Sequence, residues 1–143
     1  MSRVELPEER VQDRIRVTDL DFQRHMGNTA FTDLFANARF TFLNHHVRPV
    51  VGQDEAFFVL VHLEVDFIRQ VHHPATVETT TRPVKVGRSS LRLQQQMRSD
   101  GELVATAESV MVLAERDTGQ SKPWPEEIAQ WRVPLTAAPQ NHV

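Results

Sequence analysis

The residues whose types and spacing could do chemistry lie in one short polar segment, from Asp19 to Asn28. Asp21 and His25 place a carboxylate and an imidazole four residues apart, just before an amphipathic pattern begins. The first N–H groups of a helix have no partners inside the helix and attract negative charge. A carboxylate beside them can act as general base or nucleophile while the N–H groups hold an oxyanion. An aspartate in this place can equally cap the helix or brace the loop, and the spacing alone leaves both interpretations open.

A long helix must position this segment. From about Asn28 to His46 the apolar residues recur at steps of three and four, which predicts one amphipathic helix. Asn28 or Thr29 can cap its start, and Pro49 follows its end. Phe40 lies opposite the main apolar stripe, so the helix is expected to have a second apolar contact.

Strand patterns account for most of the remaining chain. Alternating polar and apolar residues predict a short first strand at 14–17, and Asp100-Gly101 predicts a hairpin turn. Pro83 interrupts a strand and indicates an edge position or a bulge. A short helix is expected at 126–132, with the last ten or so residues loose. The longer predicted strands span 57–67, 76–86, 89–97 and 103–114. One long helix followed by four antiparallel strands points to an α+β fold.

The register of these pieces resembles the hotdog-fold acyl-CoA thioesterases of the 4-hydroxybenzoyl-CoA thioesterase-like group. That family reads Asp-x-Asp-x-x-Gly-His-Val-Asn-Asn, followed by a helix ending in Glu-x-Ala-Arg. The resemblance continues downstream and covers roughly residues 10–128. The matching positions are Asp19, Asp21, His25, Asn28, Phe35, Ala38, Arg39, then 66–69, 86–91 and 117–123. The resemblance implies an antiparallel sheet wrapped around one long central helix.

Several positions depart from the family pattern. Arg24 replaces the family's Gly, Gly27 replaces its first Asn, and Phe31 replaces a Tyr of the helix. Some relatives carry their essential carboxylate as a Glu on the central helix, but the two positions for it are Ala36 and Asn37 here. Asp21 is therefore the expected catalytic carboxylate.

The resemblance implies roles for the neighbours of Asp21. The backbone N–H at Asn28 is expected to face the thioester oxygen, while its side chain caps the helix. His25 either orients Asp21 or the substrate carbonyl, or simply fixes the turn. Arg39 is expected to form a structural ion pair, with Asp19 or with a partner subunit.

Positive charge near the strand ends suits the phosphates of coenzyme A. Arg69 and Arg88 are the favoured contacts, with Lys85 and Arg92 as further cations. Gly87, Ser89 and Ser90 flank Arg88, and a glycine allows backbone to approach a ligand closely. Exposed cations at strand ends can also serve only to protect the sheet edge.

Composition narrows the functional classes. The 143 residues predict a single domain, and a net charge of −3 gives no reason to expect nucleic acid or an anionic membrane as partner. Without cysteine there is no thiolate nucleophile and no disulfide. No apolar run is long enough for a membrane span or a signal core, which favours a cytoplasmic location. The pairs His45-His46 and His72-His73 lack accompanying ligand spacing, so no metal site is expected.

The sequence therefore predicts an acyl-CoA thioesterase that forms a homodimer or homotetramer. Coenzyme A is part of the substrate, and no separate cofactor is expected. Two alternatives stay open: a thioesterase for acyl carrier protein, and a non-catalytic acyl-CoA-binding hotdog protein. The departures at Arg24 and Gly27 keep the second alternative open.

Overall fold

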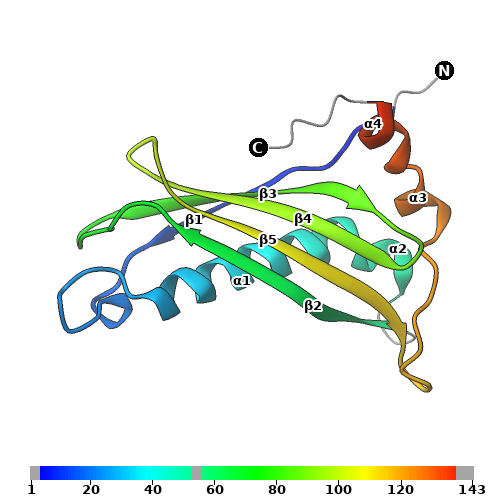
Figure 1. Cartoon of the computed structure of the whole chain (residues 1–143), viewed down its shortest axis with the longest axis horizontal. Coiled ribbons are helices and arrows are strands. Elements are labelled where there is room, and N and C mark those ends of the chain that lie inside the picture. Colours follow the sequence, from blue (N-terminus) through cyan, green and yellow to red (C-terminus); the bar gives the residue numbers. More distant parts are fainter. Residues whose placement is uncertain (1–3, 53–55, 138–143) are drawn as a thin grey trace.

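The computed structural model describes residues 4–52 and 56–137, which form one antiparallel sheet with a long helix across one face (Figure 1). The sheet order is β1-β3-β4-β5-β2, and every neighbouring pair is antiparallel. The strands are β1 (Glu9–Arg14), β2 (Ala56–Phe67), β3 (Thr76–Val86), β4 (Ser90–Ser99) and β5 (Glu102–Glu115). The expected α+β hotdog architecture is confirmed.

The central helix α1 (Asn28–His46) has the predicted bounds. Phe35, Ala38 and Phe42 are fully buried against the sheet, because their spacing of three and four residues keeps them on one face. The short helix α2 (Arg48–Val51) follows, with Pro49 inside its first turn. Among the described residues, no helix is long and apolar enough to cross a membrane.

The first strand was predicted wrongly. It runs over Glu9–Arg14, whereas 17–19 form a short 3-10 helix, η1 (Val17–Asp19). The alternation at 14–17 reflects the burial of Ile15 alone, at the point where the chain leaves the strand. In β1 the half-buried residues Glu9, Val11 and Asp13 alternate with exposed polar ones, and Val11 is the one apolar residue of the strand, so hydrophobicity does not reveal it.

The structure also tests the predictions for Pro83, for the hairpin turn and for the C-terminal region. Among the described residues β1 pairs with β3 only over 76–81, so Pro83 lies past this pairing at a local edge of the sheet, and the register with β4 shifts beside it; both the edge position and the bulge are confirmed. Asp100 and Gly101 both adopt positive φ, as a two-residue hairpin turn requires. The C-terminal region forms two short helices, α3 (Glu126–Ala129) and α4 (Arg132–Ala137). The prediction of a loose C-terminal tail is therefore wrong as far as Ala137. Residues 138–143 lie outside the described residues.

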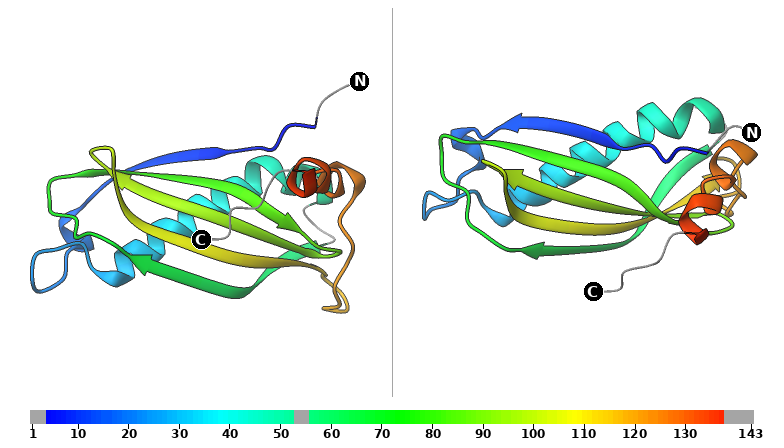
Figure 2. Two further views of the ribbon diagram at one scale, coloured as in Figure 1. Left: turned by 45° about the horizontal axis from the view of Figure 1, so that its top comes forward. Right: turned by 90° about the horizontal axis from the view of Figure 1, so that it is seen from above.

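The two ends of the sheet differ in what covers them. Trp124, Ile128 and Trp131 pack onto the end where α1 finishes, so α3 and α4 close that end of the core. The loop containing Asp21 lies at the opposite end, beside the connection from β2 to β3 (Figures 1 and 2). The helices α3 and α4 therefore cover one end of the sheet and leave the end with the Asp21 loop uncovered.

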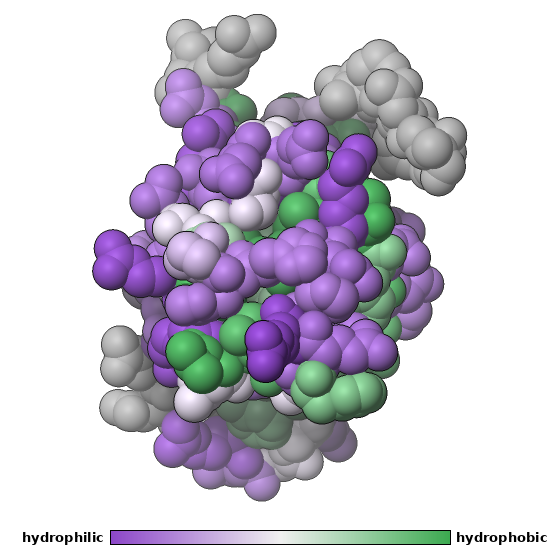
Figure 3. Space-filling view, turned by 90° about the vertical axis from the view of Figure 1, so that its left-hand side faces the viewer, coloured by the Kyte–Doolittle hydropathy of each residue, from purple (hydrophilic) through white to green (hydrophobic). Residues whose placement is uncertain are grey.

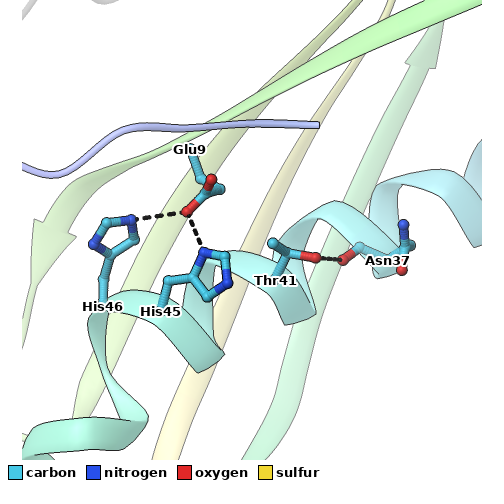
Figure 4. Close-up of polar contacts among 5 residues, drawn as sticks. All are labelled: Glu9, Asn37, Thr41, His45 and His46. Carbon is cyan, nitrogen blue, oxygen red and sulfur yellow. Dashed lines mark hydrogen bonds and ion pairs between the residues drawn. The ribbon is translucent and has the colours of Figure 1, made fainter. Parts of the chain in front are cut away.

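A polar contact ties β1 to the last turn of α1 (Figure 4). One carboxylate oxygen of Glu9 lies 2.8 Å from Nδ1 of His45 and 3.0 Å from Nε2 of His46. Burial at this contact raises the pKa of Glu9, but the hydrogen bonds and charge of the two imidazoles outweigh it and leave the pKa below its ordinary value. The adjacent histidines thus converge on one acceptor.

Candidate active site

The Asp21 loop is a tight hairpin held against the start of α1. Asp21 and His25 are joined by a backbone hydrogen bond of 2.8 Å, from the N–H of Asp21 to the carbonyl of His25. The N–H of Gly27 donates to the carbonyl of Asp19 at 3.0 Å, and the N–H of Met26 donates to Val71 at 2.8 Å. These bonds fix the loop to the helix start and to the segment after β2, so the position of Asp21 follows from backbone geometry.

Backbone hydrogen bonds hold one oxygen of the Asp21 side chain, Oδ1. Oδ1 accepts the backbone N–H of Gln23 at 2.9 Å and that of His25 at 3.3 Å. A Cβ placed on Gly27 would lie 3.5 Å from the Cβ of Asp21, so the aspartate stands against the residue that precedes α1. Asp21 therefore stabilises the loop through hydrogen bonds and also lies beside the N-terminus of α1.

Gly27, and not Asn28, is the N-cap of α1. Its backbone is extended, and no side chain donates or accepts a capping hydrogen bond there. The predicted capping role of the Asn28 side chain is therefore wrong. Asn28 is the first residue of the helix, and the N–H groups of the first turn have no partners within the helix. The backbone role proposed for Asn28 does not depend on its side chain.

Four of the predicted site residues line one open pocket of about 340 Å³. Asp21, His25 and Asn28 come from the loop and the helix start, and Arg69 comes from the end of β2. Phe31 and Phe67 add an apolar wall, with their ring centroids 5.4 Å apart in an edge-to-face arrangement. The pocket thus places groups that can take a proton or donate hydrogen bonds to a carbonyl next to an apolar surface that suits an acyl group.

The pocket opens at the end of the molecule seen in Figure 3, where green apolar side chains lie among purple polar ones. Arg69 forms an ion pair of 3.6 Å with Glu102, but both side chains are largely exposed, so the pair holds Arg69 only weakly. The exposed apolar residues of this end are Val17, Phe22, Phe67 and Ile68.

His25 has a neighbour that no sequence pattern indicated. Its imidazole contacts that of His72 edge to face, with centroids 4.6 Å apart and ring planes at 87°. A short antiparallel bridge pairs the two residues. The sequence relates the adjacent His72-His73 pair only to a possible metal motif, and nothing in its spacing connects His72 to a loop some fifty positions earlier.

Asp19 and Arg39 do not pair, contrary to one of the two expectations for Arg39. Asp19 instead bonds Arg16: Oδ2 accepts the backbone N–H at 2.8 Å, and Oδ1 accepts the guanidinium at 3.1 Å. Burial raises the pKa of Asp19, but the bonds from Arg16 outweigh it and hold the pKa below its ordinary value. Asp19 is therefore a structural acid of the loop.

The backbone conformation at Arg24 explains why the family has a glycine at this position. Its φ is 66°, in the left-handed region that favours glycine. The family's glycine at this position suits the turn, and Arg24 adopts the same backbone conformation at an energetic cost.

The remaining predicted coenzyme A contacts lie far from this pocket. Gly87, Arg88 and Ser89 form the turn between β3 and β4, at the other end of the sheet. A Cβ on Gly87 would collide with Oγ of Ser90, so the glycine is needed for packing within the turn. The indole of Trp124 donates to the carbonyl of Ser90 at 2.9 Å, and Arg132 donates to those of Val86 and Gly87. Within one chain, Arg69 reaches the Asp21 pocket and the Arg88 turn does not.

Known proteins show the same architecture. A predicted thioesterase from Bacillus stearothermophilus is 25% identical, with a TM-score of 0.76 over 91% of this chain and 95% of that one. A 1,4-dihydroxy-2-naphthoyl-CoA thioesterase from Synechocystis is 13% identical, with a TM-score of 0.74 over 92% and 97% of the two chains. At that identity the second likeness concerns the fold alone.

A curated relative gives a partial match in sequence. The chain is 28% identical over 72 residues to 1,4-dihydroxy-2-naphthoyl-CoA hydrolase from Synechococcus elongatus. The match spans 50% of this chain and 53% of the relative, so about half of each protein is compared.

The family model of the thioesterase-like superfamily matches residues 15–132, which include the Asp21 loop, the central helix and the four longer strands. The chain belongs to the thioesterase-like superfamily.

Proposed function

We propose that the protein hydrolyses acyl-CoA thioesters, with the carbonyl bound at the start of α1. The observation that supports this most is the placement of Asp21 against Gly27, beside the free N–H groups of the helix's first turn. Attack on the carbonyl develops negative charge on its oxygen, which the N–H at Asn28 and the helix dipole stabilise. Asp21 takes the proton of an attacking water or attacks the carbonyl itself.

The chemistry needs few groups because a thiolate is a good leaving group. The braced Oδ1 of Asp21 leaves Oδ2 available to face the pocket, and His25 lines the same pocket. In this proposal His25 orients the substrate carbonyl, while the ring of His72 limits the rotation of His25.

The active unit is a dimer formed through β2. This strand is at one edge of the sheet and exposes a series of apolar side chains: Phe57, Val59, Leu60, Val61, Leu63 and Phe67. An edge strand with free backbone groups and apolar side chains favours pairing with a second copy. A two-fold axis through the middle of β2 would pair the two strands antiparallel.

Such pairing explains why the predicted site is divided between two ends of one chain. The start of the partner's β2 would lie beside the end of the first copy's β2, where Arg69 and Asp21 are. The turn carrying Arg88 lies at the same end of the sheet as the start of β2. A coenzyme A molecule whose thioester reaches Asp21 in one copy would then run toward the Arg88 turn of the other.

Hydrolysis of a panel of acyl-CoAs, followed with a thiol-trapping reagent, tests the activity. Turnover of acyl-CoA that is lost on replacing Asp21 supports the proposal. Binding of acyl-CoA without any turnover would identify a non-catalytic binding protein instead. Turnover only when the acyl group is attached to acyl carrier protein would assign the alternative substrate.

A further inference from the structure

Arg39 on α1 is buried without a counter-charge among the described residues. Only 9% of its surface is exposed, and its Nη1 atom is sealed from solvent without a hydrogen-bond partner. Burial alone lowers the pKa of Arg39, with no carboxylate near enough to oppose the effect. An arginine stays charged under such conditions, and an unpaired buried charge is costly. A charge retained at this cost calls for a binding partner.

The helix connects Arg39 directly to the candidate active site. Phe31, Phe35 and Arg39 follow each other at intervals of four residues and form one ridge of α1. Phe31 lines the pocket at the helix start. Arg39 lies eleven residues beyond Asn28, about 16 Å along the axis, and its side chain tilts back toward the N-terminus. An acyl group whose carbonyl is bound at Asn28 and that extends along this ridge would bring the far end of a medium-length chain to the guanidinium.

Two further buried polar atoms lie at this level of the sheet. Oε1 of Gln95 and Oγ of Ser109 have no hydrogen-bond partner, and both residues are fully buried. The amide nitrogen of Gln95 donates to the carbonyl of Phe35 at 2.9 Å, which places Gln95 one turn before Arg39. Ser109 pairs with Leu93, two positions along β4 from Gln95, so the two side chains are diagonal neighbours.

These polar residues separate two apolar clusters. Phe31 and Phe35 belong to the cluster near the candidate active site, and Phe42 and Leu43 to the cluster closed by the C-terminal helices. The polar level between the clusters marks how far an apolar acyl group can extend before it meets polar side chains.

Pairing of β2 with a second copy brings no carboxylate to Arg39. Leu60, Leu63, Val65 and Phe67 pair with buried residues of β5 and share their helix-facing side. Glu64 and Asp66 alternate with them and point to the opposite face of the sheet. The helix-facing side of β2 is apolar and partly exposed, and a symmetric copy would add more of the same.

We propose that Arg39 binds a hydrogen-bond-accepting oxygen on the acyl group, remote from the thioester. The substrate class is then an acyl-CoA that carries a carboxylate at its far end, because an anion supplies the counter-charge that Arg39 lacks among the described residues. This inference rests on the proposed binding of acyl-CoA with its carbonyl at Asn28. Leu60 and Leu63 of β2 supply apolar contact for the carbon skeleton between the two polar ends. An acyl group with an apolar end leaves the guanidinium unpaired, and such sites discriminate strongly against analogues that lack the polar group.

Two matched pairs of substrates separate a carboxylate from a neutral oxygen. Octanedioyl-CoA is compared with octanoyl-CoA for a carboxylate on an aliphatic chain. Hydroxynaphthoyl-CoA is compared with naphthoyl-CoA for a neutral ring hydroxyl. We expect kcat/KM for octanedioyl-CoA to exceed that for octanoyl-CoA roughly tenfold or more, as a charge-assisted hydrogen bond predicts, and the hydroxyl pair to differ less. A preference in the hydroxyl pair alone would overturn the carboxylate assignment.

The variant Arg39→Met keeps an apolar stem at this position but removes the guanidinium and its charge. We expect it to reduce the preference for the polar member toward one. Arg39→Lys keeps the charge but loses the planar fork, so it should retain part of the preference. Arg82→Met is the matched control: Arg82 bonds Gln94 on the outer side of the sheet, and its loss should leave the ratio unchanged.

Binding measurements make the outcome independent of turnover. The thioether analogues octyl-CoA and carboxyheptyl-CoA bind without being hydrolysed, and calorimetry gives their relative affinities. A preference for the carboxylated thioether that Arg39→Met removes supports the inference even if the protein hydrolyses nothing, in which case only the proposed activity fails. Equal kcat/KM values for the two members of every substrate pair, together with equal affinities for the two thioethers, would overturn the inference while leaving the proposed activity intact. Failure to bind either thioether, or an unchanged preference in Arg39→Met, would also overturn it; if that variant does not fold, the wild-type ratios and Arg39→Lys decide.

Discussion

Oδ1 of Asp21 accepts the backbone N–H of His25 at 3.3 Å, so the aspartate braces the same loop that positions the imidazole. Asp21→Asn keeps this acceptor but removes the charge and the capacity to take a proton. We expect kcat for acyl-CoA to fall by roughly two orders of magnitude or more, with KM and melting temperature close to wild type. Steady-state kinetics and thermal melting provide the measurements.

The control for this variant is chosen from the structure. Asp19→Asn is unsuitable because Asp19 bonds Arg16 and its loss should lower the melting temperature. Asp33→Asn, on the exposed side of α1, should change neither activity nor stability. Wild-type turnover by Asp21→Asn would remove Asp21 from the mechanism.

Arg88 lies in the turn between β3 and β4, and within the described part of the chain its guanidinium makes one long contact, 3.5 Å to Oγ of Ser121. If it meets a phosphate of coenzyme A, Arg88→Ala should raise KM with kcat nearly unchanged, because the contact is equal in ground and transition states. One exposed charge-assisted contact should be worth ~1–2 kcal/mol. An unchanged KM would direct attention to Arg69 or Lys85 instead.

β2 carries the proposed dimer contact. We expect light scattering to give at least a dimer for the wild-type protein at micromolar concentration. Leu63→Asp places a charge on the exposed apolar side of this strand and should shift the protein toward the monomer. Gln12→Asp changes the opposite edge strand, β1, and should leave the assembly intact. A monomeric wild-type protein would contradict both the dimer and the two-chain site.

Glu9 links stability to pH through its contacts with His45 and His46. Its pKa is lowered in the folded state, so the stabilisation is fully present above the ordinary value of 4.5 and is lost as pH falls through the folded pKa. Melting temperatures of wild type and Glu9→Gln should differ most above that value and converge in more acidic buffer. A difference that stays constant across the acid range would show that the carboxylate charge is not responsible.

Arg24 adopts a positive φ of 66° in the hairpin before α1. Arg24→Gly should raise stability by about 1 kcal/mol, because glycine adopts this conformation without the steric penalty of a side chain. Chemical denaturation measures the change. Arg98→Gly, in the strand β4, is the opposite control and should be destabilising.

The sequence by itself determined the elements whose local pattern is strong. The helix from Asn28 to His46 has the predicted bounds because one-sided burial imposes a period on the sequence, and the strand from Thr76 to Val86 has them because its Thr and Val residues favour a strand. It also identified Asp21, His25, Asn28 and Arg69, which the structure gathers around one pocket. The first strand escaped detection because neither of its faces is apolar.

Only the tertiary structure decided which distant residues meet. Antiparallel pairing brings His72 to His25 and separates the Arg88 turn from Asp21 by the length of the sheet. The absence of a partner for the Arg39 guanidinium among the described residues could not be foreseen either: the expected ion pair with Asp19 does not form, because the 3-10 turn directs Asp19 to Arg16. Such contacts depend on where the chain folds back, whereas local pattern records only which side of each element is buried.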